Sequence, residues 1–152
     1  MKHPLKILYA EDDVLLNELT TELLKGEGID CVSVFNGEEA RFVLEKETFD
    51  LLLTDFQMPK MNGAELLFWC RKNAIHLPVI FLSGNLDRLS IEELALKDCC
   101  TTVLTKPAAF SDLLRVIEVS TSRSHEFDCR PDPDAEFPGQ HRTIDLLERL
   151  NN

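Results

Sequence analysis

Five short runs of hydrophobic residues, rich in β-branched and aromatic side chains, recur along the first 105 residues of the chain. Runs of this length that are bounded by turn residues are typical of strands buried in a sheet. The predicted strands are Leu5–Ala10, Ile29–Val34, Leu51–Thr54, Pro78–Ser83 and Thr101–Thr105.

The segments that follow these strands space their hydrophobic residues as a helix does, with one apolar face each. In the first of them Leu15, Leu19 and Leu23 recur every four residues. Asp13 and Asn36 are predicted N-caps of the first two helices, and glycines follow the first one. The predicted helices are Val14–Gly26, Gly37–Glu47, Ala64–Asn73, Asp87–Lys97 and Ala108–Ser120.

Strand and helix alternate five times, which favours right-handed crossovers and a parallel sheet. Because a strand in such a sheet is buried on two sides, helices must cover both faces. The pattern therefore predicts a doubly wound α/β fold.

The composition changes beyond Ser120, where three prolines and a glycine stand among many charged residues. Such a segment cannot build a hydrophobic core. We therefore expect one domain over residues 1–122, a linker over 123–142 and a tail over 143–152. The tail sets Ile144, Leu147 and Leu150 on one helical face, but a helix this short needs a docking surface to persist.

Charge and composition narrow the partners and the location. The formal net charge is -11, which disfavours sequence-independent binding to nucleic acid. No hydrophobic run approaches the ~20 residues needed to cross a bilayer, and the five cysteines lack C-x-x-C spacing. We expect a cytoplasmic protein with thiol cysteines and with no membrane or nucleic-acid partner.

Polar residues follow four of the predicted strands. Glu11, Asp12 and Asp13 follow the first strand and Asp55 the third, while the fourth ends at Ser83 and Lys106 follows the fifth. Carboxyl ends of parallel strands meet at one edge of a sheet, so these groups are expected to converge. Taken singly, each also fits an ordinary role, since acids suit helix N-termini and Ser83 precedes a glycine.

Clustered carboxylates repel one another unless a cation neutralises them. Oxygen ligands without histidine or cysteine favour Mg²⁺, with Mn²⁺ as the other candidate, and Mg²⁺ commonly contacts phosphates. An oxygen nucleophile, a divalent ion and further donors are what phosphoryl transfer requires. Asp55, the ion, Ser83 and Lys106 would supply that set.

Four motifs occur in the order of a known family: LKILYAEDD, LLLTDFQMPKMNG, VIFLSGN and VLTKP. Over roughly residues 5–120 the chain resembles the receiver domain of response regulators, the signalling proteins of two-component systems. The resemblance implies a flavodoxin-like fold with strand order 2-1-3-4-5. It also implies that Asp55 accepts a phosphoryl group from a histidine kinase or a histidine phosphotransfer protein, and that a downstream effector protein reads the result.

The resemblance further implies a role for each residue of the site. The metal ligands would be Glu11, largely through water, Asp12, Asp55 and the backbone carbonyl of Gln57. Ser83 would bind a phosphoryl oxygen and Lys106 would pair with the carboxylate and then with the phosphate. Pro107 would follow a cis peptide bond, as is characteristic of the family.

One position departs from the family pattern. Receivers carry Tyr or Phe three residues before the lysine, and here that position is Val103. This leaves a second hypothesis open, a receiver-like interaction module that works without phosphorylation. A third, a Mg²⁺-dependent phosphohydrolase, lacks a D-x-D motif, and we expect no enzyme beyond self-phosphorylation and self-dephosphorylation. The sequence leaves the oligomeric state open.

Overall fold

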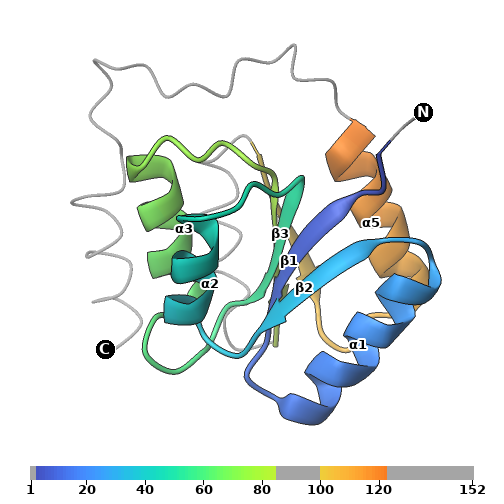
Figure 1. Ribbon diagram of the computed structural model, residues 1–152. Coiled ribbons are helices and arrows are strands. Elements are labelled where there is room, and N and C mark those ends of the chain that lie inside the picture. Colours follow the sequence, from blue (N-terminus) through green and yellow to red (C-terminus); the bar gives the residue numbers. More distant parts are fainter. Residues whose placement is uncertain (1–2, 85–99, 123–152) are drawn as a thin grey trace.

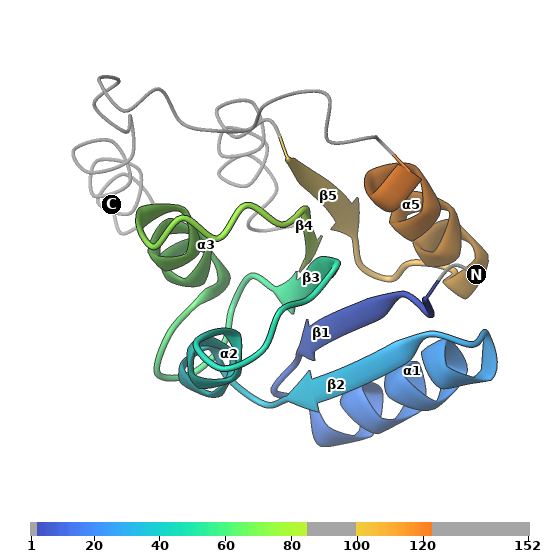
Figure 2. The ribbon, with the colours of Figure 1, turned by 45° about the horizontal axis from the view of Figure 1, so that its top comes forward.

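The computed structural model describes residues 3–84 and 100–122. Five parallel strands form one sheet in the order β2-β1-β3-β4-β5 (Figures 1 and 2). The predicted doubly wound fold and strand order are confirmed. The strands are β1 (Lys6–Ala10), β2 (Asp30–Val34), β3 (Leu51–Asp55), β4 (Val79–Ser83) and β5 (Thr101–Thr105).

The helices cover both faces of this sheet. Figure 2 shows α2 and α3 on one face and α1 and α5 on the other. The predicted helix Asp87–Lys97, the predicted linker 123–142 and the predicted tail 143–152 lie outside the described residues. The described helices are α1 (Val14–Gly26), α2 (Gly37–Leu44), α3 (Gly63–Lys72) and α5 (Phe110–Ser122).

Alternate residues of the strands enter two separate hydrophobic clusters. Leu8 and Ala10 of β1 belong to the cluster under α2 and α3, whereas Ile7 and Tyr9 belong to the cluster that includes residues of α1 and α5. All four side chains are fully buried. This arrangement explains why the strands read as continuous hydrophobic runs, since neither face of the sheet is left to solvent.

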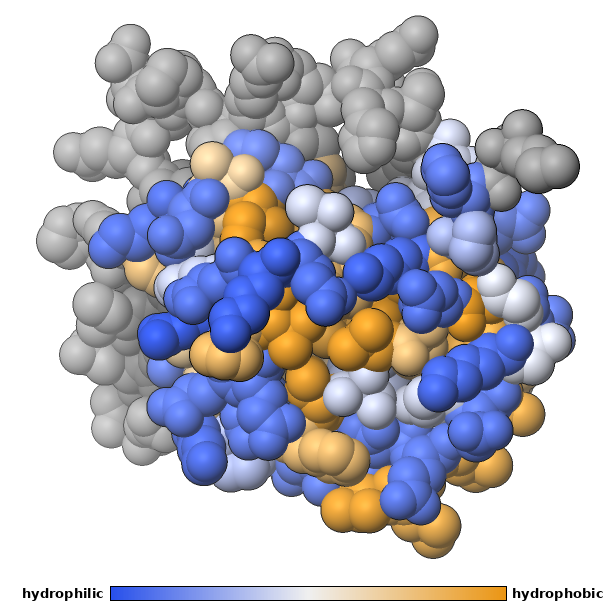
Figure 3. Space-filling model, in the orientation of Figure 1, coloured by the Kyte–Doolittle hydropathy of each residue, from blue (hydrophilic) through white to orange (hydrophobic). Residues whose placement is uncertain are grey.

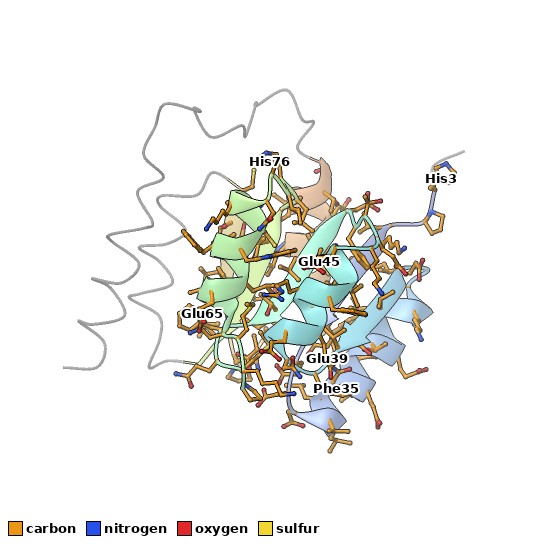
Figure 4. All side chains as sticks on the ribbon, turned by 60° about the vertical axis from the view of Figure 1, so that its left-hand side comes forward. His3, Phe35, Glu39, Glu45, Glu65 and His76 are labelled. Carbon is orange, nitrogen blue, oxygen red and sulfur yellow. The ribbon has the colours of Figure 1, made fainter. Side chains whose placement is uncertain are left out.

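Side-chain caps begin the first three helices. Asp13 Oδ1 accepts a hydrogen bond from Leu16 N at 3.1 Å, and Asn36 Oδ1 accepts one from Glu39 N at 2.9 Å. Both predicted N-caps are therefore confirmed. Asn62 caps α3 in a capping box with Glu65, whose position at the start of that helix is labelled in Figure 4.

Helix α1 turns its polar face inward. Leu15, Leu19 and Leu23 are 76%, 56% and 42% exposed. The residues that α1 buries are Asn17, Thr20, Thr21 and Leu24. The apolar row that marks this helix in the sequence is thus an outer face, and the core side of α1 is mostly polar.

Asn17 gives a physical reason for this orientation. Its side-chain amide donates to the carbonyl of Glu11 at 3.0 Å and to the carbonyl of Val34 at 2.9 Å. These carbonyls lie at the carboxyl ends of β1 and β2, and the Val34 carbonyl also accepts from the Glu11 backbone amide at 3.1 Å. The buried Asn17 amide donates to both carbonyls at once, which a leucine at this position could not do.

Two further expectations concern cysteines and membranes. Cys31 and Cys70 are buried free thiols, but Cys100 is disulfide-bonded, so the expectation of five thiols is wrong for Cys100. Within residues 3–84 and 100–122, none of the helices has the length and hydrophobicity needed to cross a bilayer.

Replacing Asn17 with alanine is expected to lower the free energy of unfolding by about 1–3 kcal/mol, because the buried Glu11 carbonyl loses its side-chain donor and the Val34 carbonyl loses one of its two donors. Urea denaturation monitored by circular dichroism measures this loss. Glu18→Ala, on the exposed side of the same helix, is the matched control and should change stability by less than about 0.5 kcal/mol. Equal stability of the two variants would contradict the assigned role of Asn17.

Candidate functional site

The carboxyl ends of β1, β3 and β5 bring three predicted site residues into contact. Lys106 Nζ lies 3.1 Å from Glu11 Oε1 and 3.3 Å from Glu11 Oε2. The same nitrogen lies 3.2 Å from Asp55 Oδ2. One ammonium group therefore joins residues that are 95 and 51 positions away from it in the sequence.

The two carboxylates that contact this ammonium group belong to a cluster of three. Oxygen atoms of Glu11, Asp12 and Asp55 all lie within 4.8 Å of one another. Glu11 is buried, Asp55 is half-buried and Asp12 is exposed, so the cluster opens to solvent on one side. An oxygen-only donor set of high negative charge suits a hard divalent ion such as Mg²⁺.

Asp13, the third acid of the EDD sequence, has a different role. Its carboxylate is engaged as the N-cap of α1. The three acids therefore differ in their surroundings. Glu11 is buried, Asp12 is exposed at the open side of the cluster, and Asp13 caps α1.

Electrostatics at the cluster perturb Glu11 most clearly. Burial, followed by repulsion from Asp55, raises the pKa of Glu11 to about 7, although Lys106 opposes the shift. Burial alone would lower the pKa of Lys106, but attraction to Asp55 and Glu11 outweighs it and the pKa is raised. Lys106 is thus held as a cation, and the site carries excess negative charge whenever Glu11 is ionised.

The backbone around Asp55 is tightly constrained. Thr54 is fully buried, and its hydroxyl donates to the Asp55 carbonyl at 2.9 Å. Gly63 N donates to the Phe56 carbonyl at 2.8 Å. A methyl group added at Gly63 would come within 2.7 Å of the Asp55 carbonyl oxygen. Gly63 is therefore needed for its small size.

Lys106 is positioned by the ends of β4 and β5. Its backbone amide donates to the Ser83 carbonyl at 2.6 Å, and the Lys106–Pro107 peptide bond is cis, as the family resemblance implies. The polypeptide turns at this point, and the lysine side chain extends to the ends of β1 and β3. The sequence predicts Lys106 as a site residue, but it does not show that the side chain extends to both Glu11 and Asp55.

Ser83 and Gln57 differ from the other predicted site residues in their surroundings. Ser83 is buried at the end of β4, and its hydroxyl donates to the Gly84 carbonyl at 2.8 Å. Gln57 lies two residues beyond Asp55 with an exposed side chain, and the metal-binding role of its backbone carbonyl stays a prediction.

Val103 occupies the centre of β5, beside Phe81 of β4. It is partly buried and packs against the cluster of hydrophobic residues under α2 and α3. A side chain of this size cannot swing between an outer and an inner position as a large ring can.

The comparisons with known proteins agree with this geometry. Residues 7–118 match the family described as response regulator receiver domain. The chain belongs to that family.

Curated relatives and solved structures point the same way. The chain is 38% identical over 122 residues to the transcriptional regulatory protein CpxR homolog of Haemophilus influenzae, covering 78% of this chain and 51% of the relative. It is 37% identical over 123 residues to CpxR of Escherichia coli, covering 79% and 50%. The chain thus spans about half the length of these curated relatives.

Among solved structures, the receiver domain of the Francisella response regulator 1452 superposes with a TM-score of 0.72 at 31% identity. The match covers 80% of this chain and 98% of that domain. A receiver domain protein from Clostridium thermocellum gives 0.71 at 29% identity, over 78% and 95%.

The pKa of Glu11 predicts how Mg²⁺ binding depends on pH. The ion favours the ionised carboxyl group, so binding releases a proton and tightens as the pH rises through about 7. We expect the dissociation constant for Mg²⁺, measured by titration calorimetry, to be about tenfold higher at pH 6 than at pH 8. Glu11→Gln should bind more weakly, with little pH dependence in this range. A flat profile for the unmodified chain would contradict the prediction.

Proposed function

We propose that the chain accepts a phosphoryl group on Asp55 from a histidine kinase or a histidine phosphotransfer protein, and passes the signal on through protein contacts. The observation that carries the proposal is the Lys106 ammonium group, which bridges Asp55 and Glu11 beside a cluster of three carboxylates. Family membership supports it, because receiver domains work with histidine kinases and effectors.

The chemistry follows from the positions of these residues. A carboxylate oxygen of Asp55 attacks the phosphorus atom, the bond from phosphorus to the donor nitrogen breaks, and an aspartyl phosphate forms. The Asp55 side chain is 16% exposed, enough for its oxygen to meet a donor at the open side of the cluster. Lys106 balances part of the charge that the phosphoryl oxygens bring.

Mg²⁺ is the proposed cofactor, with Mn²⁺ as the alternative. Receiver domains bind Mg²⁺ at an acidic pocket, and Glu11, Asp12 and Asp55 form such a pocket here. When bound, the ion would offset the mutual repulsion of these carboxylates and screen the phosphoryl oxygens. Asp12 and Asp55 would hold it directly, with Glu11 through water and the Gln57 carbonyl completing the set.

Signal output would begin at Ser83. Its hydroxyl would leave the Gly84 carbonyl and donate to a phosphoryl oxygen, which shifts the start of the segment that follows β4. Because residue 103 is a valine, this position has no aromatic ring that could rotate in this step. Output must therefore rely on the backbone that carries Ser83 and Lys106.

The curated relatives bear on whether a nucleic-acid partner is expected. The relatives from Haemophilus influenzae and Escherichia coli are named transcriptional regulatory proteins and are about twice as long as the matched region. We propose that the receiver domain itself does not bind nucleic acid, given the acidic character of a chain whose net charge over all 152 residues is -11. A longer chain that contains this domain would add whatever its further segment binds. A cytoplasmic location stays a prediction.

Incubation with acetyl phosphate and Mg²⁺ is expected to add one phosphoryl group to the chain, seen by intact mass spectrometry. Asp55→Asn, the isosteric control, should remain unlabelled, and a chelator should prevent labelling of the unmodified chain. Labelling of Asp55→Asn at the same level as the unmodified chain would overturn the proposal.

A second candidate function is a receiver-like module that works without phosphorylation, and the small Val103 side chain favours it. The two candidates differ in how an effector protein responds. Binding of that protein equally to phosphorylated chain and to Asp55→Asn would favour the second candidate. Steady hydrolysis of a simple phosphomonoester would instead indicate the phosphohydrolase hypothesis.

A further inference from the structure

Cys100 differs from the other described cysteines in its chemical state and in its position. Cys31 and Cys70 are free thiols that are 5% and 0% exposed. Burial raises the pKa of Cys31, which lowers the fraction of the reactive thiolate. Cys100 is half-buried directly before β5, and it is disulfide-bonded. The described part of the chain therefore holds one oxidised cysteine and two thiols that burial protects from oxidation.

The sequence limits the partner of Cys100 to two residues. Cys31 and Cys70 are free, which leaves Cys99 and Cys129, both outside the described residues. Bonded cysteines usually have Cα atoms about 4.4–6.8 Å apart, whereas consecutive Cα atoms are about 3.8 Å apart across a trans peptide bond. Cys99 is therefore too close in the chain for an ordinary disulfide with Cys100, and Cys129 is the partner that fits.

The fold returns the chain to the neighbourhood of Cys100 before it reaches Cys129. Strand β5 runs from the amino edge of the sheet to its carboxyl edge, and α5 runs back and ends at Ser122. Figures 1 and 2 both show the start of β5 and the end of α5 on the same side of the molecule. Leu104 of β5 packs against the cluster that contains Ile117 of α5. Seven residues lead from Ser122 to Cys129, and an extended chain of that length reaches about 23 Å.

A bond between two copies of the chain would first require the copies to associate. Figure 3 shows a face of the molecule on which hydrophilic residues surround smaller hydrophobic areas. The net charge of -11 adds repulsion between copies. A bond within one chain needs no such association, because α5 already brings the polypeptide back to the edge where Cys100 lies.

Strand β5 is the part of the sheet that such a bond would stabilise most. It lies at the edge of the sheet and none of its five residues is buried, whereas every residue of β4 is buried. The Cys100 carbonyl accepts from Val79 N at 2.9 Å, so Cys100 begins the pairing of β5 with β4. Beyond the other end of β5, Lys106 bridges Glu11 and Asp55. A covalent link at Cys100 restrains the strand that leads to the cation of the site.

We propose that Cys100 and Cys129 form a reversible thiol–disulfide site that closes the loop of residues 100–129 and stabilises β5. In reducing compartments, protein disulfides are usually transient and redox-sensing rather than structural. The site is independent of whether Asp55 accepts a phosphoryl group.

The oxidant is a small-molecule disulfide such as glutathione disulfide. One cysteine thiolate attacks it, which forms a mixed disulfide and releases one glutathione thiolate. The second cysteine thiolate attacks the cysteine sulfur atom of the mixed disulfide, which releases the other glutathione thiolate. Two cysteine thiols are oxidised, one glutathione disulfide is reduced, and the two thiol protons pass to the glutathione thiolates. Excess reduced glutathione reverses both steps.

Peptide mapping of the full chain without reductant, after oxidation with glutathione disulfide, tests the pairing. Trypsin does not cleave before proline, so it places Cys99 and Cys100 in the peptide of residues 98–115 and Cys129 in that of residues 124–142. The expected product is the two peptides joined, about 2 Da lighter than their summed mass. Cys99→Ser is the matched control and should keep the link, whereas Cys129→Ser should lose it. A disulfide within the peptide of residues 98–115, or a link between two copies, would rule out the pairing.

Amide hydrogen exchange tests the effect on β5. Residues 101–105 should exchange at least about tenfold more slowly in the oxidised chain than in the chain reduced with dithiothreitol. Cys129→Ser should show no difference between the two conditions. Equal exchange of β5 in the linked and the reduced chain would contradict the proposed stabilisation. Unchanged exchange of β1 in each variant shows that it remains folded.

Discussion

The balance of charge around Lys106 is the interaction on which the rest of the site depends. Two carboxylates from distant parts of the sequence share one ammonium group, and a third lies within reach of both. Such a group of acids is stable only while cations offset it. The parallel sheet makes this arrangement possible, because it brings the carboxyl ends of β1, β3 and β5 to one edge. The order of the strands therefore determines where the charged groups of the site can meet.

The backbone around the site is built to be rigid. Asn17 holds the ends of β1 and β2 together, Thr54 holds the Asp55 carbonyl, and Gly63 allows the chain to pass close to that carbonyl. None of these residues contributes a charge. Their effect is to fix where the charged groups stand, so that a small change at Asp55 is not lost in local motion.

Much of this architecture could be predicted from the sequence, for identifiable reasons. Hydrophobic runs bounded by turn residues located all five strands, and Asp13 and Asn36 marked helix starts because their side chains accept backbone hydrogen bonds. Four polar strand ends indicated the site, and the structure brings Glu11, Asp12, Asp55 and Lys106 together. The orientation of α1 could not be read this way, since periodicity shows that a face is apolar but not whether it faces the core. The tight approach at Gly63 depends on how the folded chain brings Asp55 and Phe81 against it, which the sequence pattern around Gly63 does not show.

The polar inner face of α1 has a consequence for how such a domain can change over evolutionary time. Because Asn17, Thr20 and Thr21 attach the helix to the sheet, the stability of the fold depends little on the outward-facing side chains of α1. Substitutions there can alter which neighbours the helix accepts without loosening its attachment. The same scaffold can thus diversify its associations while its interior, and the acidic pocket at its edge, stay as they are.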